Sequence, residues 1–146
     1  MILFLTPVLN LFLWGDHTDE LIAGLLTSEA AQQTAHDYAS DTLGKTVISA
    51  PDRSGFIVNA LLVPYLLSAI RMLENGVASR EDIDAGMVAG CGMPMGPLAL
   101  CDLIGLDTML SIAETLFAEF GDPASVAPAL LRRHVDAGLL GRKTGR

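Results

Sequence analysis

The sequence is poor in the residues that mark several large functional classes. Only 5% of its residues are aromatic and 18% are charged, and 9 Lys and Arg stand against 17 Asp and Glu, for a formal net charge of -8. Binding to a nucleic-acid backbone needs clustered positive charge. No such cluster precedes the last few residues, so we do not expect nucleic acid as a partner.

Residues suited to disulfides or metal sites are also scarce. Cys91 and Cys101 are the only cysteines, and their spacing fits neither a redox pair nor a metal knuckle. We expect both to be buried free thiols in a reducing compartment, and hence a cytoplasmic protein. The histidines (His17, His36 and His134) lack metal-ligand spacing, so no metal site is expected, and His36 and His134 are interpreted as solvated side chains on polar helical faces.

Familiar catalytic and targeting motifs are missing as well. The chain has no GxGxxG after a strand, no GxSxG, no HExxH and no P-loop, so any redox cofactor must be held elsewhere. The apolar opening MILFLTPVLNLFLWG is broken by Pro7 and Asn10 and is shorter than the roughly 20 residues of a membrane-spanning helix. It also lacks the basic start and cleavage site of a signal peptide, so we expect neither membrane insertion nor secretion.

Apolar residues, in contrast, are abundant. They make up 51% of the chain, which is ample for a core and more than a compact monomer of this size can easily hide. The sequence therefore predicts a folded domain that pairs with a partner.

Local signals predict a helix and one strand in the first part of the chain. Ser28 can cap a helix over residues 28–43, and Gly44 is placed to end it. KTVISA (residues 45–50) has the β-branched residues of a strand. Because a single strand cannot stand alone, its partner strands are expected to lie outside the chain.

The turn-rich PDRSG (residues 51–55) predicts a boundary, and only helices are expected after it. A long apolar helix with Pro64 in its interior comes first, and shorter helices follow. The expected helical segments are residues 54–76, 79–88, 97–104, 107–120 and 125–137. The predicted fold class is thus mostly α.

Three features could carry chemistry. Asn59, inside the apolar FIVNALL, is either a core amide that bonds a neighbouring helix or an amide aimed into an active site. The loop GCGMPMGP, with Met93, Met95 and Pro97, offers an adaptable apolar wall suited to an acyl chain, although a tight turn with core-filling methionines is the more ordinary interpretation. Glu20 follows an acidic cluster, where the start of a surface helix is the ordinary explanation.

A long stretch of the sequence resembles a known family. DRSGFIVNALLVPYLLSAIRMLENGVASREDIDAGMVAGCGMPMGPLALCDLIGLDTM is similar to the C-terminal domain of the L-3-hydroxyacyl-CoA dehydrogenases, particularly the 3-hydroxybutyryl-CoA dehydrogenase branch. The likeness runs from about Thr27 to Arg146 and rests on SGFIVN, LVPYL, EDID, the GxPMGP loop, DLIGLD and GRKTG.

The resemblance implies a domain organisation. Residues 51–146 would be a helical substrate-binding and dimerisation domain of the 6-phosphogluconate-dehydrogenase-like C-terminal type. Residues 1–50 would be a poorly matched lead segment followed by the trailing helix and strand of a truncated Rossmann domain.

The resemblance also implies a reaction. Members of the family oxidise the 3-hydroxyl of an acyl-CoA to a ketone with NAD, which is held mainly by an N-terminal Rossmann domain that this chain lacks. The helical domain closes over the acyl group and forms the dimer. The expected partners are an acyl-CoA substrate and either a second copy of the chain or a nucleotide-binding domain.

Individual positions follow from the same resemblance. Asn59 matches the family's Asn at the reacting centre, Glu20 the Glu that orients the catalytic His, and Lys143 in GRKTG a cofactor-contacting lysine. The catalytic His has no counterpart, because Val8 stands at its position and His17 lies too close to Glu20.

Two further differences from the family's sequence pattern weaken the expected docking surface. Ala60 stands where the family usually has Arg, and the chain stops before the expected GFY ending. We expect one half of a split or truncated enzyme, inactive alone, or as the alternative a non-catalytic helical dimerisation module or degenerate remnant.

Overall fold

The computed structural model describes residues 18–145 and divides the chain between Ile57 and Val58 into two compact units. The apolar lead segment, with Val8 and His17, lies outside the described residues.

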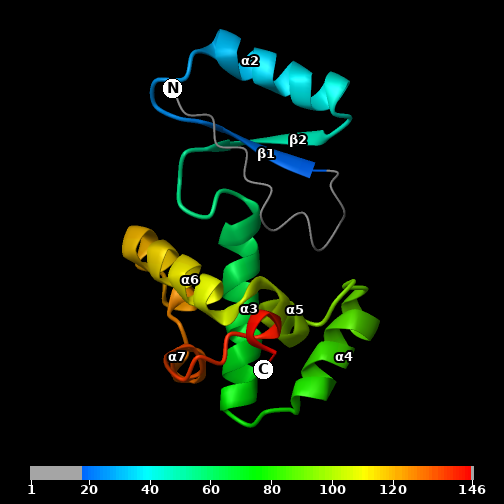
Figure 1. Ribbon diagram of the computed structural model, residues 1–146, viewed down its shortest axis with the longest axis vertical. Coiled ribbons are helices and arrows are strands. Elements are labelled where there is room, and N and C mark those ends of the chain that lie inside the picture. The colour runs from blue at the N-terminus through cyan, green and yellow to red at the C-terminus, as the bar shows by residue number, and fades with distance from the viewer. Residues whose placement is uncertain (1–17, 146) are drawn as a thin grey trace. The chain divides into compact units, whose positions relative to one another are not determined.

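The first unit is a parallel β-α-β arrangement. Strand β1 pairs with strand β2 in parallel, from Thr18 opposite Thr46 to Ala23 opposite Pro51, and helix α2 forms the crossover that parallel strands require (Figure 1). Its elements are β1 (Thr18–Ala23), α2 (Glu29–Asp37), the π-helical turn η1 (Tyr38–Thr42) and β2 (Thr46–Pro51). The expectation that every partner strand lies outside the chain was wrong, since β1 is within it.

The ends of α2 and β2 follow from local signals. Ser28 caps α2, because its hydroxyl accepts a hydrogen bond from Ala31 N at 3.3 Å. Gly44, at φ 66°, occupies the left-handed region just after η1, as its predicted stop position requires. The predicted strand is confirmed with a shift of one residue at each end, and Pro51 stands at the end of the strand, where a missing N–H is tolerated.

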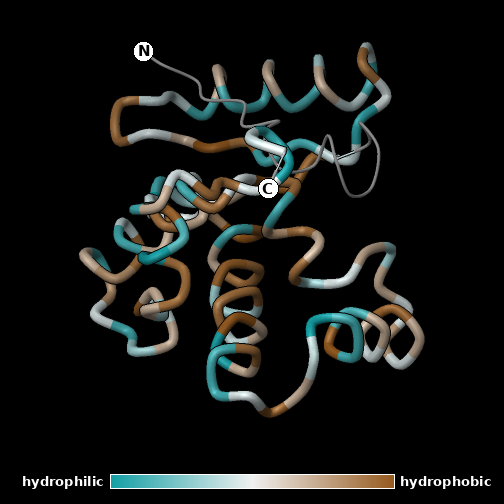
Figure 2. Tube along the Cα trace, turned by 60° about the horizontal axis from the view of Figure 1, so that its bottom comes forward, coloured by the Kyte–Doolittle hydropathy of each residue, from teal (hydrophilic) through white to brown (hydrophobic). Residues whose placement is uncertain are grey.

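The second unit contains only helices and turns among its described residues, as predicted. Helix α3 passes through its middle, with α4 on one side and α6 and α7 on the other (Figure 1), and α3 is apolar along much of its length (Figure 2). The elements are α3 (Val58–Glu74), α4 (Arg80–Cys91), α5 (Pro97–Ile104), α6 (Leu106–Phe120), the 3₁₀ turn η2 (Pro123–Ser125), α7 (Ala129–Asp136) and the 3₁₀ turn η3 (Arg142–Thr144).

Helix α3 begins later than predicted. Gly55 and Phe56 have positive φ of 79° and 46°, which a right-handed helix cannot include, so the helix starts at Val58 and not at residue 54. Pro64 lies inside the helix as predicted. Its ring nitrogen has no hydrogen to donate to the carbonyl of Ala60, so the helix lacks one internal bond there.

The core of the second unit lies around α3. Fully burying one Leu or Met side chain contributes about 1.5–3 kcal/mol, so this cluster stabilises the unit. The buried apolar side chains include Val63, Leu66, Leu67, Ile70, Ile83, Leu98, Leu100, Cys101, Met109, Ala113, Leu116 and Leu131. No helix within residues 18–145 is long and apolar enough to cross a membrane.

Three predicted helix ends need correction. Helix α4 continues through Cys91 and stops at Gly92, whose φ of 67° ends it, so the following loop is shorter than expected. The last helix begins at Ala129 and not at residue 125, because Pro128 precedes it with an extended backbone. Asp107 was expected as a helix cap, but α6 begins one residue earlier and Asp107 lies in its first turn.

Candidate functional site

Glu20 is buried on strand β1, and its side chain is 4% exposed. Its Oε1 accepts a hydrogen bond from the backbone N–H of Ile57 at 2.9 Å, at the last residue of the first unit. The interpretation of Glu20 as the start of a surface helix was therefore wrong. A buried carboxylate must have hydrogen-bond donors, and this contact supplies one of them.

Asn59 lies in the first turn of α3 and is half-buried. Its amide Oδ1 is buried, and no group within residues 18–145 donates a hydrogen bond to it. A buried acceptor without a donor costs about 1–3 kcal/mol. Of the two interpretations that the sequence left open, the core hydrogen bond is therefore not observed at this oxygen, and the role of Asn59 in an active site stays a prediction.

Met93 and Met95 lie on the loop between α4 and α5, and both side chains are half-buried. We call residues 92–96 the methionine loop. Pro97 follows it as the first residue of α5, as predicted, and its side chain is fully buried within the unit. The two methionines thus keep part of their surface exposed, whereas Pro97 starts the helix and packs inside. Their predicted role in lining the acyl site stays a prediction.

Sequence reasoning missed Asp84, which supports the methionine loop. Its carboxylate accepts hydrogen bonds from Leu98 N at 2.7 Å and Ala99 N at 3.0 Å, at the start of α5. The hydroxyl of Tyr65 is buried without a partner in the described part of the chain, and burial, with smaller contributions from Cys91 and Asp84, raises the pKa of Tyr65. Asp84 belongs to the EDID motif, but nothing in that motif reveals which distant N–H groups it binds.

Lys143 lies in η3, where its Nζ forms an ion pair with Asp107 of α6. The hydrogen bond from Lys143 is the main reason why the pKa of the Asp107 carboxyl lies below its usual value. Both side chains are more than two-fifths exposed, so solvent screens the pair. The backbone holds this turn in place, because Leu106 N donates to the carbonyl of Leu140 at 3.3 Å. A cofactor contact by Lys143 stays a prediction.

The two cysteines differ from each other. Cys101 is buried as expected, and burial raises the pKa of its thiol to about 12, with Asp102 and Asp84 adding to the rise. Cys91, expected to be buried, is exposed at the end of α4. Neither forms a disulfide, and no group of His, Cys, Asp and Glu side chains within residues 18–145 could hold a metal ion.

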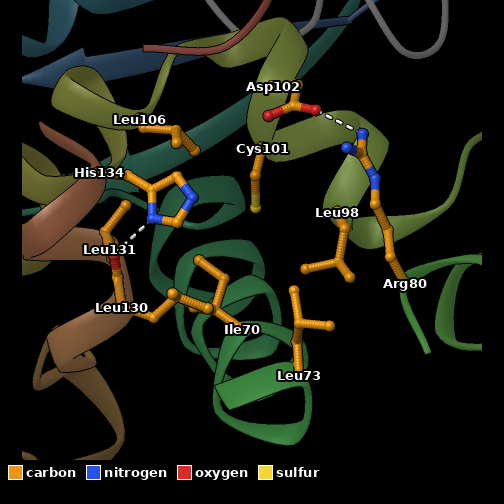
Figure 3. A pocket seen from close by; sticks show the side chains of 10 residues that line it. All are labelled: Ile70, Leu73, Arg80, Leu98, Cys101, Asp102, Leu106, Leu130, Leu131 and His134. Carbon is orange, nitrogen blue, oxygen red and sulfur yellow. Dashed lines mark hydrogen bonds and ion pairs between the residues drawn. The ribbon is translucent and has the colours of Figure 1, made fainter. Parts of the chain in front are cut away.

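His134 is also less solvated than expected. Its Nδ1 donates to the carbonyl of Leu130 at 2.8 Å, and its ring borders a small cavity of about 100 Å³ (Figure 3). An ion pair of 2.5 Å between Arg80 and Asp102 closes one side of this cavity. The residues around it are Ile70, Leu73, Arg80, Leu98, Cys101, Asp102, Leu106, Leu130, Leu131 and His134.

The predicted site residues are distributed over both units. Asn59, the methionine loop and Lys143 belong to the second unit, and Glu20 belongs to the first. Within the described residues the β-α-β arrangement has the single Gly24 between β1 and Ser28, not a glycine-rich phosphate cradle. These residues therefore do not fit a whole dinucleotide, and only Lys143 is a candidate to contact one.

The known proteins that are similar to this chain belong to one family. The family model for the C-terminal domain of 3-hydroxyacyl-CoA dehydrogenase matches residues 55–146. A 3-hydroxybutyryl-CoA dehydrogenase of Mycobacterium tuberculosis is 57% identical over 127 residues, which cover 87% of this chain and 44% of that protein. A mitochondrial hydroxyacyl-coenzyme A dehydrogenase of Sus scrofa is 41% identical over 127 residues, 86% of this chain and 40% of the other.

Solved structures that carry the same kind of name are also similar to this chain. The crystal structure of M. tuberculosis FadB2 is similar with a TM-score of 0.86 and 56% identity, over 88% of this chain and 45% of that one. The (S)-3-hydroxybutyryl-CoA dehydrogenase PaaH1 of Ralstonia eutropha is similar with a TM-score of 0.83 and 49% identity, over the same shares of the two chains. The chain thus spans less than half the length of these relatives.

Proposed function

This chain belongs to the 3-hydroxyacyl-CoA dehydrogenase family, and on that premise we propose that it is the acyl-contacting and subunit-pairing part of an NAD-dependent enzyme that oxidises 3-hydroxybutyryl-CoA. The proposed reaction converts the 3-hydroxyacyl-CoA and NAD⁺ to the 3-oxoacyl-CoA, NADH and a proton. The single observation that carries the role of this chain is the buried amide oxygen of Asn59, which has no donor within residues 18–145.

Asn59 is proposed to bind at the reacting centre. Its Oδ1 can accept a hydrogen bond from the hydroxyl of the bound substrate, and once that proton has passed to the catalytic His, its amide N–H groups can donate to the oxygen that becomes the ketone. Such an amide positions the reacting carbon and excludes a competing water, and it does not itself take up the proton. Removal of a positioning group of this kind typically costs a large factor in turnover.

Glu20 is proposed to orient the catalytic His, which no position of this chain supplies. Burial and the hydrogen bond from Ile57 N hold its carboxylate in one position, as a residue that orients an imidazole requires. When bound, NAD would accept the hydride, and residues 18–145 would hold only a small part of it. The proposal gives Lys143 only a contact with that cofactor.

Exposed apolar side chains favour a subunit-pairing role for the second unit. Five stand on α3, α4 and α6 and two in the connecting segments, and exposed apolar side chains of this kind are what a partner surface would cover. The members are Leu61, Met72, Val77, Val88, Phe117, Phe120 and Val126. A cytoplasmic location is part of the same proposal, and the two free cysteines, typical of a reducing compartment, support it.

The test is complementation. The chain is mixed with the part of the M. tuberculosis relative that it does not match, and oxidation of 3-hydroxybutyryl-CoA is followed as NADH formation. We expect turnover in the mixture and a loss of at least about 100-fold with Asn59→Ala. The matched control is Asn75→Ala, which removes an exposed amide after the same helix and should leave the rate unchanged.

The alternative is a helical module that only self-associates. It would show the same dimer on a sizing column but no turnover in any mixture, and Asn59→Ala would change neither result. The exposed apolar side chains support this alternative as well as the enzyme, whereas the unpaired Asn59 oxygen supports only the enzyme.

A further inference from the structure

Helix α5 begins without a capping side chain of its own. Its N-cap residue is Gly96, which has none to offer. Asp84 of α4 supplies the cap across the methionine loop, because its two carboxylate oxygens accept from Leu98 N at 2.7 Å and Ala99 N at 3.0 Å. A charged acceptor at a helix N-terminus also interacts favourably with the helix dipole. One side chain thus ties the end of the loop, at the start of α5, to helix α4.

The loop backbone lies directly against Asp84. A Cβ at Gly96 would overlap the Cβ and Cγ of Asp84, closer than real atoms approach. Only glycine therefore allows the chain to pass at this position. Gly96 is buried, so the contact leaves no room for the loop to shift inward.

The other end of the loop is fixed by backbone hydrogen bonds. Gly92 N donates to the carbonyl of Val88 at 3.1 Å, and Met93 N donates to the carbonyl of Met87 at 3.3 Å. Gly92 has the left-handed φ of 67° that this helix ending requires. Between these two fixed points only three residues separate Gly92 from Gly96, and two of them are the half-buried methionines.

We propose that Asp84 is a positioning residue that sets the shape of the methionine loop and thereby presents Met93 and Met95 to the acyl chain. The proposal rests on the function proposed above. A fixed backbone lowers the entropy that binding must overcome, while the flexible thioethers still adapt to the acyl group. Asp84 itself touches no substrate, so its effect on binding passes through the two methionines.

A purely structural role for Asp84 would give a different result. If Asp84 only stabilised α5, its loss would weaken every property of the second unit together. If it positions the loop, its loss should reduce recognition of the acyl group and leave recognition of the CoA moiety unchanged. The ratio of the two affinities separates these cases.

The experiment measures the affinity of the full chain for butyryl-CoA and for CoA by calorimetry. We expect Asp84→Ala to weaken butyryl-CoA binding about five- to tenfold, the order of the cost of ordering a freed loop and its side chains on binding, with CoA binding within about twofold. Asp84→Asn keeps one acceptor oxygen and should lie between. Glu81→Gln removes an exposed carboxylate from the same helix and should change neither affinity. An equal loss for both ligands, or no loss, would overturn the proposal.

Methyl NMR on the same variants reports on the loop without any ligand. We expect the Met93 and Met95 methyl signals to shift and broaden in Asp84→Ala, while Met109, fully buried in α6, keeps its signal. Unchanged Met93 and Met95 signals would refute positioning by Asp84. If the unsubstituted chain binds butyryl-CoA no better than CoA, the proposed acyl contact fails, and the methyl spectra still decide whether Asp84 shapes the loop.

Discussion

Replacement of Asn59 by leucine should stabilise the chain while it removes the turnover expected of the complemented mixture. In the described structure Oδ1 of Asn59 is buried and receives no hydrogen bond, so folding removes it from water without compensation. Leucine has the same branched arrangement of four side-chain heavy atoms and no polar atom to desolvate. A residue whose only role is stability would not leave an acceptor buried without a donor. A residue that binds a ligand can do so, because the ligand supplies the donor.

The magnitude follows from two contributions. An unpaired buried acceptor costs about 1–3 kcal/mol, and leucine is a better helix former than asparagine by a few tenths of a kcal/mol. Because Asn59 is only half-buried, we expect the lower part of that range, about 1–2 kcal/mol. For a chain of 146 residues this corresponds to a rise in Tm of roughly 3–8 °C.

Urea and thermal unfolding followed by circular dichroism measure this change directly. Asn75→Leu is the matched control, because Asn75 is exposed just beyond α3 and the same substitution there should stay within about 0.5 kcal/mol. A loss of stability of more than about 1 kcal/mol in Asn59→Leu, with Asn75→Leu unchanged, would show that Oδ1 has a structural partner. The reasoning would then be refuted.

Three further predictions concern other parts of the second unit. In the native chain the exposed Cys91 should react with a disulfide reagent near neutral pH. Cys101 should react only on unfolding, because burial raises the pKa of its thiol to about 12. Two rapidly reacting thiols would contradict this. The hydrogen bond from Lys143 lowers the pKa of Asp107, so the pair stabilises the fold above the carboxyl's unfolded pKa of about 3.9, and this contribution decreases as the pH falls below that value. Asp107→Asn should therefore cost about 0.2–1 kcal/mol in urea unfolding at pH near 6 and less at a pH below about 3.9; the same cost at both pH values would contradict this. Gly141→Ala should destabilise by more than about 2 kcal/mol, because φ is 84° and a Cβ would lie 2.5 Å from a backbone oxygen of α5; a Tm within about 2 °C of the parent would disprove that contact.

Local signals predicted much of the fold, because their causes lie within a few residues. Ser79 caps α4 as expected, since its hydroxyl accepts from Asp82 N at 3.1 Å, and Pro97 begins α5. The late start of α3 was missed because the positive φ of Phe56 depends on the surrounding fold. Strand β1 was missed because a short TDELIA run becomes a strand only through pairing with a segment beyond α2.

The candidate site was predictable only in part for the same reason. The resemblance to a known family singled out Asn59, Glu20 and Lys143, but the sequence could not show that Glu20 is buried or that Lys143 pairs with Asp107. Nor could it show the role of Asp84, whose partners follow a loop that only the fold brings back to α4. Long-range hydrogen bonds of this kind have no local sequence signature.

The most direct test of the central claim is NADH formation from 3-hydroxybutyryl-CoA by the purified chain, measured alone and after addition of the unmatched part of the M. tuberculosis relative. The account predicts no turnover above the buffer rate for the chain alone, because the described residues form no dinucleotide cradle and no His stands at the family's catalytic position. It predicts turnover once the missing part is present. Sustained NADH formation by the chain alone would contradict the account.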